Sequence, residues 1–175
     1  MFIKKGELTI RKATSLDAGM LCKWWNDGKV MANEGFPDGL GTTDSEIIRK
    51  LTKDNDDIHR RHIIEHSGKP IGEMNYRNKG NGTAEIGIKI CDFTYQNKSY
   101  GTELLSMFIN ALFTDLGYKR IILDTNEKNT RAQYVYEKIG FIKLRINTDA
   151  WKDQYGELQS STDYELKAED YYISL

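Results

Sequence analysis

Residues 84–141 constrain the fold more than any other part of the chain, because their apolar pattern changes period several times in a short stretch. An alternating strand at 83–90 is followed by an apolar helix at 100–116, an apolar strand at 120–124 and a second helix at 129–138. A strand, a helix and a second strand in this order favour a parallel strand pair joined by a crossover helix. We therefore predict a mixed α/β fold that contains such a pair.

The remainder of the chain predicts further strands and short helices around this pair. The expected strands are 8–12, 59–66, 71–77, 141–147 and 163–166. The expected helices run from an N-cap at Ser15 to about Trp25, and over Ile47, Ile48 and Leu51 after a cap at Thr43 or Asp44. Turns are expected at 67–70 and 78–82, a Gly-rich loop at 34–43 and a polar loop at 150–160. Because the sequence contains no linker or repeat, we expect residues 1–175 to form one domain.

Composition and hydropathy argue against two classes of partner. The net charge of -1 lacks the basic excess typical of nucleic-acid-binding proteins. No apolar run approaches the roughly 20 residues that cross a bilayer, and the first residues lack the apolar block of a signal peptide. Cys22 and Cys91 are far apart in sequence, which is typical of free thiols in a reducing compartment. We expect a cytoplasmic protein with no nucleic-acid or membrane partner.

The segment 96–102, with the sequence Q-N-K-S-Y-G-T, connects a predicted strand to a predicted helix. Main-chain N–H groups at a helix start have no intrahelical partners and suit phosphate oxygens. Gly101 permits close approach of a ligand, and Lys98 adds a cation. This pattern predicts a diphosphate site, although an ordinary capped helix start would produce the same sequence.

The helix predicted at 129–138 places polar groups on one face. Asn129 and Tyr136 are seven residues apart and therefore share a face, and Gly140-Phe141 follows the helix. A phenol at this position can donate a hydrogen bond to a leaving group. The alternative is a tyrosine that only packs at a helix end.

These residues resemble the acetyl-coenzyme A-binding core of the GNAT family of N-acetyltransferases. The resemblance rests on the strand A-E-I-G-I-K-I, the loop Q-N-K-S-Y-G-T and the helix N-T-R-A-Q-Y-V-Y-E-K-I-G-F, and it is closest over residues 84–141. It implies a mixed, mostly antiparallel sheet with a central splayed parallel strand pair and flanking helices. It also implies an acyltransferase that uses acetyl-coenzyme A (acetyl-CoA) as co-substrate.

The resemblance also implies which residues bind the coenzyme. These are Ile88, Lys89 and Ile90 along the strand, Gln96, Asn97, Lys98, Ser99, Tyr100, Gly101 and Thr102 in the loop, and Asn129 on the later helix. Ser99 departs from the family pattern, which has glycine there. If the backbone is left-handed at Ser99, the side chain costs about 1–2 kcal/mol.

Two residues are candidates for proton transfer. Glu85 could take the proton of an amine directly or through a water molecule, or it could be a solvent-facing residue paired with a neighbouring strand. By resemblance, Tyr136 faces the coenzyme sulfur. Cys91 offers a covalent acetyl-cysteine route as an alternative to direct attack in a ternary complex. The histidines at 59, 62 and 66 do not make a metal-ligand pattern, so we expect no metal.

The acceptor site is expected in the N-terminal half. Trp25, Glu34 and Asp38 are the candidates, since carboxylates beside aromatics suit a cationic amine. The spacing of Trp24 and Trp25 on their helix also predicts a core stripe. The resemblance includes family members that acetylate ribosomal-protein N-termini, polyamines or aminoglycosides, so the partner expected is an amine-bearing small molecule or a protein N-terminus. A homodimer and a non-catalytic coenzyme A-binding sensor both remain open.

Overall fold

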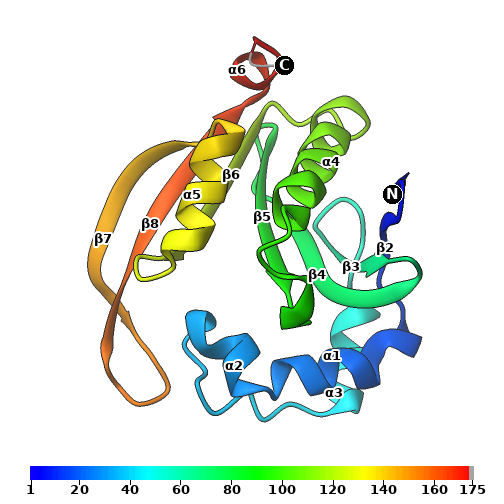
Figure 1. Ribbon diagram of the computed structural model, residues 1–175, viewed down its shortest axis with the longest axis vertical. Helices are drawn as coiled ribbons and strands as arrows, with labels where there is room; N and C mark the ends of the chain where they lie inside the picture. The colour runs from blue at the N-terminus through cyan, green and yellow to red at the C-terminus, as the bar shows by residue number, and fades with distance from the viewer. Residues whose placement is uncertain (174–175) are drawn as a thin grey trace.

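The computed structural model describes residues 1–173 and contains an eight-stranded sheet in the order β1-β2-β3-β4-β5-β6-β8-β7 (Figure 1). The strands are β1 (Phe2–Lys5), β2 (Leu8–Lys12), β3 (His59–His66), β4 (Lys69–Asn78), β5 (Thr83–Ile90), β6 (Arg120–Asn126), β7 (Ile142–Lys152) and β8 (Leu158–Lys167). Neighbouring strands are antiparallel except β5 and β6, which are parallel. The predicted mixed, mostly antiparallel sheet is confirmed.

Helices cover both faces of this sheet. They are α1 (Ala18–Trp25), α2 (Gly28–Met31), α3 (Asp44–Leu51), α4 (Tyr100–Thr114), α5 (Thr130–Ile139) and α6 (Ala168–Ile173). In Figure 1, α4 and α5 lie in front of the sheet, whereas α1, α2 and α3 gather at its lower end. The consecutive residues Ile63 and Ile64 of β3 show the two-sided packing, because Ile64 joins the core under α4 and Ile63 joins the core of α1 and α3.

The parallel strands β5 and β6 separate after a short paired stretch. Thr83–Glu85 pair with Arg120–Ile122, and β5 and β6 form no further pairs with each other beyond these residues. Beyond that point β5 continues to pair with β4 as far as Ile90, and β6 continues to pair with β8 as far as Asn126. The two strands therefore diverge toward the end of the molecule where α2 lies (Figure 1). This divergence is the splayed central pair that the family resemblance implies.

The largest error in the predicted elements concerns the C-terminal hairpin. The polar loop expected at 150–160 is wrong, since β7 extends to Lys152 and β8 begins at Leu158. Only 153–157 turn, closed by a hydrogen bond from Asp153 N–H to the Glu157 carbonyl (3.0 Å). The first half of β7 alternates apolar and polar residues and was expected as a strand, but its second half, T-D-A-W-K, loses this alternation.

Smaller differences occur at two turns. The first helical segment begins with a 3₁₀ turn at Ser15–Asp17, and the Asp17 carboxylate accepts a hydrogen bond from Thr14 N–H (2.8 Å). Thr14, and not Ser15, is therefore the N-cap. The turn expected at 67–70 contains only Ser67 and Gly68, which both have positive φ (49° and 78°) and suit a two-residue hairpin.

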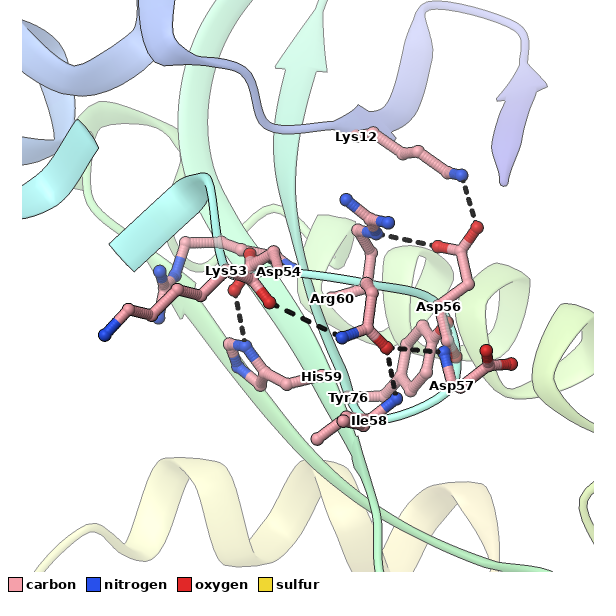
Figure 2. Close-up of polar contacts among 11 residues, drawn as sticks. Lys12, Lys53, Asp54, Asp56, Asp57, Ile58, His59, Arg60 and Tyr76 are labelled. Atoms are coloured by element: carbon pink, nitrogen blue, oxygen red, sulfur yellow. Dashed lines mark hydrogen bonds and ion pairs between the residues drawn. The ribbon is translucent and has the colours of Figure 1, made fainter. Parts of the chain in front are cut away.

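A polar cluster anchors the loop between α3 and β3 (Figure 2). The Asp56 carboxylate accepts hydrogen bonds from Lys12 Nζ (2.5 Å) and Arg60 Nε (2.7 Å), which lower its pKa to about 2. The Tyr76 hydroxyl donates to the Asp56 carbonyl (2.8 Å), and His59 Nδ1 lies 2.8 Å from Asp54 Oδ1. These contacts join the loop to β2, β3 and β4.

Candidate active site

A cavity of about 960 Å³ opens where β5 and β6 separate. Its volume is within the range of small-molecule sites, about 300–1,000 Å³. Residues 85–90 of β5 form one wall, and residues 124–126 of β6 with the start of α5 form the opposite wall. The loop before α4 closes one end, and residues of α2 and the turn after it contribute to the other. The cavity therefore lies at the elements that the sequence motifs occupy.

The loop before α4 lines the cavity with most of its predicted residues. Gln96, Asn97, Ser99, Gly101 and Thr102 line it, whereas Lys98 and Tyr100 do not. The Lys98 ammonium lies 5.6 Å from the centre of the Tyr95 ring, and the Tyr100 hydroxyl is 3.1 Å from His66 Nε2. The loop start is fixed because the Gln96 amide donates to the Ile90 carbonyl (2.9 Å) and its oxygen accepts from Arg131 (2.6 Å).

The backbone at Ser99 meets the condition under which replacing the usual glycine carries a steric cost. Ser99 is the N-cap of α4 and has a left-handed conformation (φ 62°). Its side chain makes no capping hydrogen bond, so nothing local offsets the steric cost. Asn97 is also left-handed (φ 59°), a conformation that asparagine tolerates better than most residues.

Strand β5 presents two different faces. Ile88, Lys89 and Ile90 all line the cavity, and the edge of β5 toward β6 has no ladder partner there. The Lys89 ammonium turns to the α2 side, where it lies 3.6 Å from carboxylate oxygens of both Glu34 and Glu73. An unpaired strand edge is suited to an extended ligand that adds main-chain hydrogen bonds.

Helix α5 carries Asn129 and Tyr136 to the opposite wall of the cavity. Asn129 is the N-cap, and its side-chain oxygen accepts a hydrogen bond from Ala132 N–H (3.2 Å). Tyr136 packs against the rings of Phe141 and Tyr164, with centroids at 5.9 and 5.7 Å. Burial raises the pKa of the Tyr136 phenol, which therefore stays protonated. Its hydroxyl forms no hydrogen bond within residues 1–173, so the donor is free to meet a ligand.

Three carboxylates line the cavity, and two of them have cationic partners. Glu85 lies 3.0 Å from Lys79 Nζ and 3.5 Å from Arg77 Nη1. Glu34, in the turn after α2, pairs with Lys89. Asp124 of β6 is the third, and the sequence did not indicate it because it ends an apolar strand. Burial raises the pKa of the Asp124 carboxyl, with repulsion from Asp163, Glu85 and Glu34 adding to the effect.

Trp25 and Asp38 lie outside the cavity lining. Trp25 is buried in the core of α1 and α3, where its indole N–H donates to Glu73 (2.7 Å). The core prediction for this tryptophan is confirmed. Asp38 is held by the C-terminal hairpin, because its N–H donates to the Gln154 side chain (2.9 Å) and its carboxylate accepts from the Tyr155 hydroxyl (2.6 Å).

Trp151 of β7 lines the cavity, and the sequence gave no signal for it because residues 150–160 are polar. A Cβ added at Gly35 would come within 2.3 Å of the Trp151 ring, so the hairpin packs directly on the turn after α2. A main-chain hydrogen bond from Gln154 N–H to the Gly35 carbonyl (2.8 Å) fixes this contact. The hairpin is thus part of the cavity wall.

The model of the acetyltransferase (GNAT) domain family matches residues 7–142. The chain belongs to the GNAT family. This places it among the N-acetyltransferases, as the motifs predict. An uncharacterized N-acetyltransferase, p20, from Bacillus licheniformis is 27% identical over 148 residues, which cover 81% of this chain and 83% of that protein.

Solved structures share the GNAT fold. A spermidine N-acetyltransferase from Vibrio cholerae, in complex with coenzyme A and spermine, superposes with a TM-score of 0.85 at 22% identity, covering 95% of this chain and 98% of the other. A ribosomal-protein α-N-acetyltransferase in complex with coenzyme A superposes with a TM-score of 0.84 at 15% identity, covering 95% and 98%. These likenesses establish the fold, and the two ligand-bound relatives are coenzyme A complexes.

The covalent alternative receives no support from the surroundings of Cys91 in this GNAT structure. Burial raises the pKa of the Cys91 thiol, which opposes formation of a thiolate, and Cys91 does not line the cavity. The three histidines contact different partners: His59 meets Asp54, His62 meets Tyr76 and Phe108, and His66 meets Tyr100. In residues 1–173 no three potential ligands gather in a metal-binding geometry.

Within the same range, no helix has the length and apolar composition that crossing a bilayer requires.

Proposed function

We propose that this GNAT protein transfers the acetyl group of acetyl-CoA to a primary amine by direct attack in a ternary complex, with residues 1–175 acting as one domain. The cavity between β5 and β6 is the observation that carries the proposal. It joins a helix start suited to phosphate, an unpaired strand edge and a free phenol donor in one space.

The chain's residues fit acetyl-CoA along the length of this cavity. The pyrophosphate would meet the main-chain N–H groups at the start of the 15-residue helix α4, where Gly101 leaves room for close approach. The pantetheine arm would pair with Ile88–Ile90 as an added strand, and Asn129 would contact it from α5. Bound acetyl-CoA supplies an activated acyl group as a thioester.

Tyr136 would stabilise the departing sulfur. A phenol of ordinary pKa, about 10, gives its proton to a thiolate of pKa about 8.5 at a cost of roughly 2 kcal/mol. Burial raises the pKa of Tyr136 further and makes complete transfer less favourable still. The role that fits is therefore a hydrogen-bond donor to the developing thiolate.

The acceptor would enter from the α2 side of the cavity and would be cationic. Glu34, Glu85 and Asp124 line this region, and Trp151 adds an aromatic face. The solved relatives whose names mention spermidine or a ribosomal-protein α-amino group illustrate such acceptors. Trp25 and Asp38 would act indirectly, because Trp25 positions Glu73 and Asp38 positions the hairpin.

The reaction needs a free amine, since an acceptor with a pKa near 10.4 is almost entirely protonated at neutral pH. Glu85 can take this proton directly or through water, although two cations already hold its carboxylate. We place the reaction in the cytoplasm, where Cys22 and Cys91 would remain the free thiols that the structure contains.

Titration with acetyl-CoA followed by thiol-release assays tests this function. We expect acetyl-CoA to raise the melting temperature, and thiol to be released with at least one amine from a panel of spermidine, an unblocked peptide and an aminoglycoside. Stabilisation without thiol release for any amine would support a non-catalytic coenzyme A sensor instead. If acetyl-CoA produced no stabilisation, the cavity assignment would be wrong.

A further inference from the structure

Asp124 lies where the two central strands have just separated. Ile122 is the last residue of β6 that pairs with β5, and its partner is Glu85. Continued pairing would have put Asp124 opposite Gly87, but the strands diverge and Asp124 lines the cavity instead. Side chains alternate along a strand, so Asp124 shares the face of Glu85.

The Asp124 side chain and the Tyr136 phenol lie on opposite sides of the sheet layer. Leu123, next to Asp124, is buried in the core that includes Tyr136. Both residues nevertheless line the same cavity, and the Asp124 charge contributes to the raised pKa of Tyr136. A thioester held between β5 and β6 would therefore have the phenol on one side and Asp124 on the other.

Asp124 is also the cavity carboxylate without a partner. Glu85 and Glu34 have cationic partners, as described above, and the nearby Asp163 of β8 accepts hydrogen bonds from Arg145 (2.7 Å) and Asn147 (2.9 Å). Asp124 makes no ion pair and no side-chain hydrogen bond with any other residue in 1–173. Its lone pairs are free to accept a proton from a ligand.

We propose that Asp124 is the general base that takes the proton from the acceptor amine, an inference that rests on the proposed acetyl transfer. Burial and the surrounding carboxylates both raise the pKa of Asp124, which makes it a better proton acceptor, and the same carboxylates attract a cationic amine. Glu85 is less suited to take the proton, because Lys79 and Arg77 already pair with its carboxylate.

The proton and electron balance of the step is as follows. The ammonium group of the acceptor gives one proton to Asp124, and the freed nitrogen lone pair attacks the thioester carbon. A C–N bond forms and the C–S bond breaks, with its electron pair moving to sulfur. The second nitrogen proton leaves to solvent as the amide forms, and the thiolate, stabilised by the Tyr136 hydrogen bond, takes up a proton to become the thiol.

The test compares wild type, Asp124→Asn and Asp163→Asn with acetyl-CoA and the amine of the panel that the wild type acetylates fastest. Asp163 is the matched control, because it is the cross-strand partner of Asp124 but already has Arg145 and Asn147 as partners. We expect Asp124→Asn to lower kcat/KM at pH 7 by about 100-fold or more. Asp163→Asn should cost no more than about threefold, since it keeps the base and removes only one of the charges that raise the pKa of Asp124.

The pH profile separates a base from a structural residue. Between pH 7 and 9 the Asp124→Asn rate should rise about tenfold per unit, because only the free amine reacts, whereas the wild-type rate should level off. Affinity for coenzyme A should stay within about twofold of wild type, measured by calorimetry. If Asp124→Asn lost its fold, Asp124→Glu would replace it and should keep the wild-type plateau at a lower rate.

The outcomes distinguish the two proposals. An active wild type with an equally active Asp124→Asn, or with parallel pH profiles, would overturn the role of Asp124 and leave the acetyl transfer standing. Loss of the plateau in Glu85→Gln, with Asp124→Asn unaffected, would assign the base to Glu85. A wild type that transferred acetyl to no amine would overturn the proposed function and this inference with it.

Discussion

At the scale of single residues, Gly101 is a position where a substitution can affect ligand binding without affecting the fold. It lies in the first turn of α4, lines the cavity, and has an ordinary helical φ. A Cβ added there would meet only Ile90 Cδ1, at 3.7 Å, which is a normal contact. The protein itself therefore does not require glycine at this position.

We expect Gly101→Val to lower acetyl-CoA affinity by tenfold or more while changing the melting temperature little. The branched side chain would extend over the main-chain donors that the pyrophosphate needs. Gly101→Ala is the matched control, and its single methyl group should reduce affinity less. Calorimetric titration of both variants measures the difference, and equal affinities for wild type and Gly101→Val would place the pyrophosphate elsewhere.

His62 is a buried residue whose charge state affects stability. Its ring is fully buried between Tyr76 and Phe108, with centroids at 5.9 and 5.3 Å, and neither ring nitrogen has a hydrogen-bond partner. Burial lowers its pKa to about 3, from an ordinary value of about 6.5. Between these two pKa values, the His62 ring binds a proton in the unfolded chain but not in the folded chain.

This difference predicts that His62 makes the folded state less stable as the pH falls below about 6.5. The free energy of unfolding should fall by up to about 1.4 kcal/mol per pH unit, until the pH reaches the folded-state pKa of about 3. His62→Leu should therefore flatten the dependence of the free energy of unfolding on pH between 4 and 6. Urea titrations of both proteins test this, and identical slopes would contradict it.

At the scale of elements, the hairpin of β7 and β8 holds the acceptor side of the cavity. The Gln154 side chain accepts from Asp38 N–H (2.9 Å) and donates to the Gly39 carbonyl (3.1 Å). These bonds tie the hairpin turn to the loop that follows α2. Trp151 and Glu34 reach the cavity from these two segments.

We expect Gln154→Ala to raise the KM for the amine about three- to tenfold and to leave acetyl-CoA affinity unchanged. The reason is that the substitution loosens the acceptor wall without touching the coenzyme wall. Tyr155→Phe, which removes one exposed hydrogen bond to Asp38, is the control with a smaller expected effect. Steady-state kinetics measures both, and a change confined to acetyl-CoA affinity would refute the assignment.

Local hydrogen bonds fix the ends of β5 and β6 on either side of the cavity. Asn126 ends β6, and its side-chain oxygen and carbonyl accept hydrogen bonds from Lys128 N–H (3.0 Å) and Asn129 N–H (2.9 Å). These bonds turn the chain from β6 into α5. Gln96 ends β5 in a similar way by bonding the Ile90 carbonyl.

At the scale of the whole molecule, a buried charge network joins the α1–α3 layer to the sheet. Glu73 of β4 is 6% exposed, accepts from the Trp25 indole, and lies 3.5 Å from Arg61 and 3.6 Å from Lys89. The Arg61 guanidinium also stacks 4.7 Å from the centre of the Trp25 ring. The carboxylate thus compensates two cations that have little access to water.

Glu73→Gln should therefore lower the free energy of unfolding by about 3 kcal/mol, because it leaves buried cations without a counter-charge. The amide oxygen can still accept from Trp25, so packing is preserved. Glu157→Gln, at an exposed position of the hairpin turn, should change stability by less than about 0.5 kcal/mol. Chemical denaturation checks both values, and a neutral Glu73→Gln would show that the network does not need the charge.

The sequence was sufficient for features set by local interactions. The period of residues 84–141 predicted the parallel pair. Thr43 caps α3 and is one of the two caps expected there, and Ser99 has the left-handed backbone for which a steric cost was expected. These features depend on helix capping, strand alternation and backbone sterics, which act over a few residues. The motif helix likewise placed Asn129 and Tyr136 on one face because helical geometry fixes that spacing.

Only the tertiary structure decided which side chains share the cavity. Asp124 reads as the end of an apolar strand, and Trp151 reads as part of a polar loop, until the splay of β5 and β6 and the packing of the hairpin bring both to one space. Trp25 and Glu73 are 48 residues apart, and their contact depends on how α1 packs on β4. Local periodicity carries no information on such distant contacts, because burial of the whole core, and not any short segment, determines them.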